Sequence, residues 1–111
     1  MGCLFTFNFP KIKEAKNVGV QSQLFKILEE TNEVEREVVS LLVCTIRNQP
    51  RDYTRLIEET LDLIHACETM LHVLIEGKLT TEAKVNRVKE VVIAKNLKRG
   101  YYADGRKEGR K

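Results

Sequence analysis

The chain has no tryptophan, only two prolines among its 111 residues, and no apolar run as long as a membrane span. A transmembrane helix needs about 20 predominantly apolar residues, so we expect no membrane partner. Proline interrupts helices, and it occurs here only as Pro10 and Pro50. Long uninterrupted helices are therefore compatible with most of the sequence.

Cysteine spacing typical of disulfide frameworks or zinc sites is also missing. The chain has three cysteines, an odd number, and no two of them form a CxxC pair: Cys3, Cys44 and Cys67. This pattern favours reduced thiols and a cytoplasmic location. His65 and Cys67 stand two residues apart and would point to different sides of a helix, so they do not predict a zinc site. A glycine-rich phosphate loop is absent as well.

Charge is unevenly distributed, although the net charge is only +3. Seven basic and two acidic residues lie between Lys95 and the C-terminus, so the preceding part of the chain is mildly acidic. A basic tail can bind nucleic acid, but basic residues beside glycines are more typical of a solvated chain end. We therefore do not expect a nucleic-acid partner, and we predict that residues 101–111 form a flexible basic tail.

Apolar residues recur at three- and four-residue steps from residue 21 onward, which is the period of amphipathic helices. The pattern predicts helices over Ser22–Arg47, Tyr53–Glu76 and, with Thr80 or Thr81 as its cap, onward to Lys98. Ser22 is the expected cap of the first helix, and Gly77 and Gly100 are expected to end the other two. The short connections favour an antiparallel hairpin with the third helix packed against it.

These predictions give an all-α fold with one helical domain over residues 21–100. Residues 1–20 are expected to form an irregular N-terminal arm, whose Phe5, Phe7 and Phe9 alternate with polar residues. The alternation would suit a short strand, but packing of the rings onto the helices or a partner subunit is the preferred interpretation. Since a chain of this size buries a small core, we expect the helices to assemble into an oligomeric helical bundle.

Acidic clusters occur on the first two predicted helices, as Glu29-Glu30-x-x-Glu33 and Glu58-Glu59-x-x-Asp62. Residues three apart on a helix project about 60° from each other, so the last two carboxylates of each cluster share one side. Glu30 and Glu59 fall within the apolar stripes, and their partners fall toward the rim. Four carboxylates along one groove would repel each other without a cation, and Mg²⁺ binds carboxylate and phosphate oxygens together. The alternative is a solvated helix surface whose glutamates pair with Arg36 and Arg55.

The sequence EETNE from Glu29 to Glu33, followed after twenty-five residues by Glu59-x-x-Asp62 within EETLDLI, resembles the EExxE…ExxD signature of the all-α nucleotide pyrophosphohydrolases. The spacing looks most like the small MazG-like proteins of bacteria and bacteriophages, over about residues 21–102. This resemblance implies hydrolysis of nucleoside triphosphates, particularly deoxyribonucleotides or non-standard nucleotides, to monophosphate and pyrophosphate. It also implies a homodimer or homotetramer that cleans or adjusts nucleotide pools. Phosphoribosyl-ATP and dUTP remain open as substrates.

The same resemblance implies roles for individual residues. Mg²⁺, or Mn²⁺ in its place, would be held by Glu30, Glu33, Glu59 and Asp62, with Glu29 supporting them or acting as a base. The run from Lys95 to Tyr102 resembles a Lys…Arg-Gly-Tyr run of the phage-type members, which implies substrate phosphate binding by Lys95, Lys98, Arg99 and Tyr101. These cations are equally consistent with a helix C-terminus stabilised by its dipole. A catalytically silent helical module that binds nucleotides is the alternative function.

Overall fold

The computed structural model describes residues 7, 9–13 and 17–102, which contain three helices and no strand. Helix α1 spans Val20–Ile46, α2 spans Thr54–Glu76 and α3 spans Glu82–Lys98. The all-α fold class is therefore confirmed, and the predicted helix ends lie within two residues of the observed ones. No helix among the described residues has both the length and the apolar character that crossing a membrane requires. Of the predicted tail, only Tyr101 and Tyr102 belong to the described residues, and the rest lies outside them.

A side chain caps the start of α3, and another side chain hydrogen-bonds the first residue of α2. The Thr81 hydroxyl accepts a hydrogen bond from the Lys84 backbone N–H at 3.1 Å, so the predicted cap of α3 is confirmed. The Asp52 carboxylate accepts hydrogen bonds from the backbone N–H and the hydroxyl of Thr54, at 3.0 and 2.8 Å. These bonds, led by the backbone one, lower the pKa of Asp52 and fix where α2 begins.

The predicted cap of α1 is wrong. Ser22 lies inside the helix, whose N-cap is Gly19, and no side chain caps this end. The Gln23 backbone N–H donates to the Gly19 carbonyl at 3.0 Å. The helical hydrogen bonds therefore begin before the first residue of the apolar pattern from which the helix start was predicted. Gly77 does end α2, but the left-handed residue of this turn is Lys78, with φ 61°.

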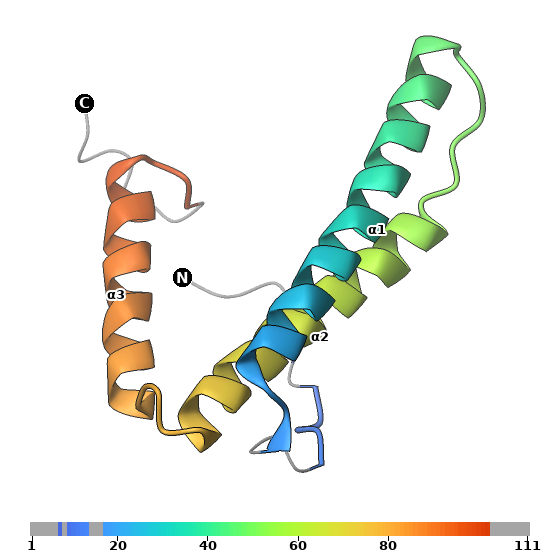
Figure 1. Ribbon diagram of the computed structural model, residues 1–111. Coiled ribbons are helices and arrows are strands. Elements are labelled where there is room, and N and C mark those ends of the chain that lie inside the picture. The colour runs from blue at the N-terminus through green and yellow to red at the C-terminus, as the bar shows by residue number, and fades with distance from the viewer. Residues whose placement is uncertain (1–6, 8, 14–16, 103–111) are drawn as a thin grey trace.

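Helices α1 and α2 lie side by side and run in opposite directions (Figure 1). The buried and half-buried residues of each helix include a series at alternating steps of four and three, the spacing of coiled-coil packing. On α1 this series is Gln23, Ile27, Glu30, Val34, Glu37, Leu41 and Cys44. On α2 it is Leu56, Glu59, Leu63, Ala66, Met70 and Val73. The described residues include only three buried apolar side chains, Ala66, Met70 and Val73, so the core is thin.

The described part of the N-terminal arm, residues 7, 9–13 and 17–19, lies outside the three α-helices and contacts α2. The Phe9 ring stacks on His65 with centroids 4.9 Å apart, and Phe7 stacks on Phe9 at 6.4 Å. Lys11 pairs with Glu76 at 3.1 Å. The expected packing of aromatic rings onto the helices therefore holds for Phe9, whereas Phe5 lies outside the described residues.

Helix α3 stands apart from the other two, so its expected packing against them is wrong for a single chain (Figure 1). None of its residues is buried, and Val88 and Val91 are 51% and 63% exposed. The turn through Lys78 directs the chain away from α1, and α1 and α2 already occupy each other's facing sides. The apolar side of α3 consequently remains uncovered in one chain.

Candidate metal centre

Three carboxylates converge between α1 and α2. Glu30 extends from α1, while Glu59 and Asp62 extend from successive turns of α2, and one oxygen of each lies within 4.8 Å of the others. Glu30 and Glu59 are only 8% and 9% exposed, whereas Asp62 is open to solvent. The two glutamates therefore lie within the helix interface and Asp62 lies at its rim, as the apolar pattern predicts.

The positions of Glu30 and Glu59 argue against an ordinary solvated surface. Both occupy steps of the interface pattern, which carries apolar side chains such as Val34 and Leu63 at most of its other positions. Burying a carboxylate costs free energy unless it is paired or binds a cation. Helix packing alone would be better served by leucine at either position, so the two glutamates point to a requirement for negative charge.

Each buried glutamate has a basic residue four positions before it. Lys26 Nζ lies 3.6 Å from Glu30 Oε2 and 3.2 Å from Glu29 Oε1, and Arg55 Nη2 lies 3.9 Å from Glu59 Oε1. The hydrogen bond to Glu29 and the charge of Glu30 raise the pKa of Lys26. The sequence interpretation included Arg55 but missed Lys26, which the i, i+4 spacing could have revealed.

The charge of Arg55 does not fully offset the negative charges around Glu59. Burial raises the pKa of Glu59, and the charges of Glu33 and Asp62 raise it further against the opposing effect of Arg55. A divalent cation would remove this penalty. Mg²⁺ binds oxygens at about 2.0–2.1 Å, so its ligands stand about 3–4 Å apart, and small side-chain rotations would bring the three oxygens to that spacing. The donor set therefore fits a hard divalent cation.

The two other predicted acidic residues lie beside this group. Glu33 contributes to the negative charge at Glu59, while its own carboxylate accepts a hydrogen bond from Arg36 at 3.3 Å. Glu29 is turned to solvent, with its side chain 64% exposed, and it meets the centre only through Lys26. Three of the four predicted ligands are thus brought together, and Glu33 lies next to them.

The predicted phosphate-binding residues lie elsewhere in a single chain. Lys95 and Lys98 belong to the last turn of α3, and Arg99 and Tyr101 follow it. This end of α3 is remote from the α1–α2 pair (Figure 1). All four side chains are exposed, and they remain separate from the carboxylates.

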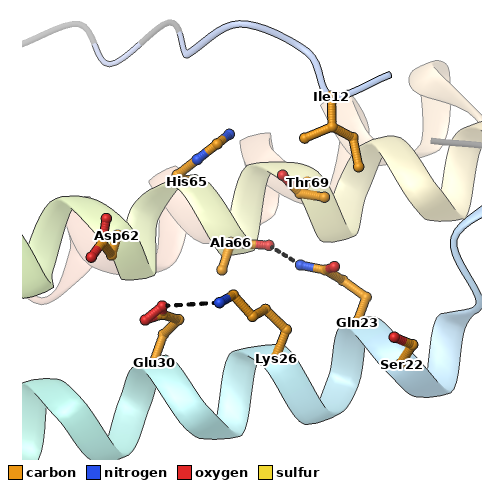
Figure 2. Close-up of a pocket in the computed structure, with 9 residues that line it drawn as sticks. All are labelled: Ile12, Ser22, Gln23, Lys26, Glu30, Asp62, His65, Ala66 and Thr69. Carbon is orange, nitrogen blue, oxygen red and sulfur yellow. Dashed lines mark hydrogen bonds and ion pairs between the residues drawn. The ribbon is translucent and has the colours of Figure 1, made fainter. Parts of the chain in front are cut away.

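A pocket of about 410 Å³ adjoins the carboxylates (Figure 2). It is lined by Ile12, Ser22, Gln23, Lys26, Glu30, Asp62, His65, Ala66 and Thr69. The Gln23 side-chain amide donates to the Ala66 carbonyl at 3.0 Å, which ties the two helices together on the pocket floor. Sequence patterns did not identify Gln23, His65 or Thr69 as pocket residues, because the N-terminal arm forms part of the wall.

Comparison of the chain with protein-family models, curated protein sequences and solved structures finds no match. The chemistry of the site therefore follows from its own residues. Carboxylates that can hold a divalent cation, with Lys26 beside them and an open pocket next to them, suit a phosphorylated ligand.

The raised pKa of Glu59 predicts how stability depends on pH without metal. The folded protein holds this proton more tightly than the unfolded chain does, so ionisation of Glu59 favours unfolding. Between the ordinary pKa of glutamate and the raised one, the stability of the wild type should fall with rising pH relative to Glu59→Gln. Urea unfolding of both proteins in EDTA across this interval measures the difference. Parallel curves for the two proteins would contradict the shift.

Proposed function

We propose that this protein is a Mg²⁺-dependent nucleotide pyrophosphohydrolase that converts a nucleoside triphosphate to its monophosphate and pyrophosphate. The observation that carries the proposal is the convergence of Glu30, Glu59 and Asp62 at a helix interface whose other positions are mostly apolar. The resemblance of the two acidic motifs to the MazG-like signature supports the same reaction. Deoxyribonucleotides or non-standard nucleotides are the proposed substrates, in keeping with a role in pool control.

The acidic side chains of the centre are the proposed metal ligands. Glu30, Glu59 and Asp62 would supply carboxylate oxygens to the cation, and Glu33, whose charge acts on Glu59, would add a fourth only after release from Arg36 and movement toward the centre. Bound Mg²⁺ would polarise the phosphate oxygens and favour ionisation of a water molecule. The overall reaction would add water across the bond between the α-phosphorus and the bridging oxygen, so that the phosphorus would gain a hydroxyl and pyrophosphate would depart with the bridging oxygen.

Lys26 is a basic residue that lines the pocket beside these carboxylates. Its ammonium group lies 3.2 Å from Glu29 and 3.6 Å from Glu30 at the edge of the pocket, where it can neutralise phosphate charge. Figure 2 shows its pair with Glu30. Glu29 holds Lys26 through their 3.2 Å contact, which gives Glu29 a positioning role. Lys95, Lys98, Arg99 and Tyr101 would join this phosphate clamp only after α3 approaches a carboxylate centre in an assembled protein.

Assembly into a homodimer or homotetramer is part of this proposal. Helix α1 exposes a second apolar line away from α2, formed by Leu24, Leu28, Val38, Leu42 and Ile46, which we call the α1 outer face. Leu28 is 59% exposed and Ile46 is 82% exposed. A surface this apolar, next to a core of three buried apolar residues, favours burial against a second copy of the chain.

The reaction is tested by pyrophosphate release from a panel of ribo- and deoxyribonucleoside triphosphates with and without Mg²⁺. We expect Mg²⁺-dependent release of equal amounts of pyrophosphate and monophosphate, and a loss of about 10²-fold or more in Glu33→Gln. Glu58→Gln is the matched control, because Glu58 is exposed on the same helix as Glu59 and has no place in the centre.

Release of inorganic phosphate in place of pyrophosphate would contradict the reaction. A folded protein that binds Mg²⁺ and nucleotide, yet releases nothing across the panel, would favour the second candidate, a silent nucleotide-binding module. The intact set of acidic residues argues for the enzyme.

A further inference from the structure

The pocket beside the carboxylates is divided by charge along its length. Its acidic end carries Glu30 and Asp62, with Lys26 next to them. Its other end is lined by the uncharged side chains of Ile12, Ala66 and Thr69 (Figure 2). A ligand with a charged and a neutral half matches this division. The volume of 410 Å³ falls in the range of about 300–1,000 Å³ that small-molecule sites occupy.

His65 lines this pocket and has a ring nitrogen without a hydrogen-bond partner. Its Nε2 is shielded from solvent and is the one buried side-chain nitrogen or oxygen of the described residues that has no hydrogen-bond partner. Leaving such an atom unpaired destabilises a protein, so a turn of the His65 ring that brings Nε2 to the pocket and to a ligand group would be favourable. Phe9 stacks on one face of the ring at 4.9 Å and 28°.

The N-terminal arm gives this end of the pocket a wall. Ile12 lines the pocket, Phe9 covers the His65 ring, and Lys11 between them pairs with Glu76 on α2. Thr69, which is 94% buried, places its side chain on the same lining one turn after His65. An aromatic ring, a hydroxyl and apolar carbon together form a surface suited to a nucleobase and its sugar.

We infer that the neutral end of this pocket binds the nucleoside half of the substrate and that His65 Nε2 hydrogen-bonds the base. The inference rests on the proposed function, since it assumes that the triphosphate lies at the carboxylate end. His65 then sets base preference, because a base that cannot pair with Nε2 leaves this nitrogen unsatisfied. Thr69 adds a hydroxyl to the same recognition surface.

Nucleoside binding without metal tests this inference independently of turnover. The probes are the common ribo- and deoxyribonucleosides and their 5′-monophosphates, added to the full chain in EDTA while the histidine ring protons are followed by NMR. We expect a preferred base to shift the resonances of His65 and to leave those of His72, which lines a different pocket, unchanged.

Two substitutions separate recognition from folding. His65→Phe keeps a ring against Phe9 but removes the nitrogen, and Thr69→Val keeps the shape but removes the hydroxyl. We expect His65→Phe to weaken binding of the preferred nucleoside by about tenfold and to reduce discrimination among bases. His72→Phe is the matched control and should bind as the wild type does.

The outcomes distinguish this inference from the proposed function. Nucleoside binding at His65 in a protein that releases no pyrophosphate would support the pocket assignment and overturn the enzyme. Pyrophosphate release by a protein whose His65 resonances no nucleoside shifts, up to the solubility limit, would overturn the pocket assignment alone. Unchanged affinity and base preference in His65→Phe would overturn it as well.

Discussion

Glu59→Gln is expected to reduce pyrophosphate release by about 10³-fold and to raise the thermal unfolding midpoint of the metal-free protein by a few degrees. The two effects have one cause. The Glu59 carboxylate is buried beside Glu33 and Asp62, so its charge opposes folding of the metal-free protein, and the same charge is needed to hold a cation. A neutral amide of similar shape removes both the penalty and the ligand.

This result is measured by thermal unfolding in EDTA and in Mg²⁺, together with turnover of the preferred substrate. Mg²⁺ should raise the unfolding midpoint of the wild type and have little effect on Glu59→Gln. Glu58→Gln controls for the loss of one negative charge on α2 and should match the wild type in both measurements. A destabilised Glu59→Gln would instead show that Glu59 is a structural partner of Arg55. Retained turnover would remove Glu59 from the proposed metal centre.

The approach of the carboxylates could be anticipated because it depends on local periodicity. Helix α1 places Glu30 between Ile27 and Val34, and α2 places Glu59 between Leu56 and Leu63. Two adjacent helices with such patterns bring their buried faces together whatever the rest of the chain does. The expected rim position of Asp62 follows from the same spacing, and the structure agrees with it.

Other features depend on contacts between distant parts of the chain, which periodicity does not record. The Phe9–His65 stack joins residues far apart in sequence and converts a helix surface into a pocket wall. The position of α3 depends on the turn at Lys78, a lysine in a left-handed conformation that propensity assigns to glycine. Lys26 differs from these features, because its i, i+4 relation to Glu30 is local and can be read from the sequence.

Self-association through the α1 outer face should make a large contribution to the stability of the folded protein. The α1 outer face points about a third of a turn away from the α2 contact, and its residues remain exposed in one chain. Burying a leucine contributes about 1.5–3 kcal/mol, so covering Leu28 and Leu42 would contribute about as much as burying Met70 and Val73 does. We therefore expect the double variant Leu28→Lys, Leu42→Lys to dissociate the assembly and to lower the unfolding midpoint by about 10 °C or more.

Light scattering during size-exclusion chromatography measures the mass, and thermal unfolding at several protein concentrations measures the coupling of folding to assembly. The wild type should be at least a dimer, with a midpoint that rises with concentration, because association contributes to its stability. Ser40→Lys is the matched control, since Ser40 is exposed on α1 but lies off the outer face. A monomeric wild type with a concentration-independent midpoint would contradict the assembly. It would also leave Lys95 and Arg99 without a route to the carboxylates, because α3 of the single chain does not bring them there.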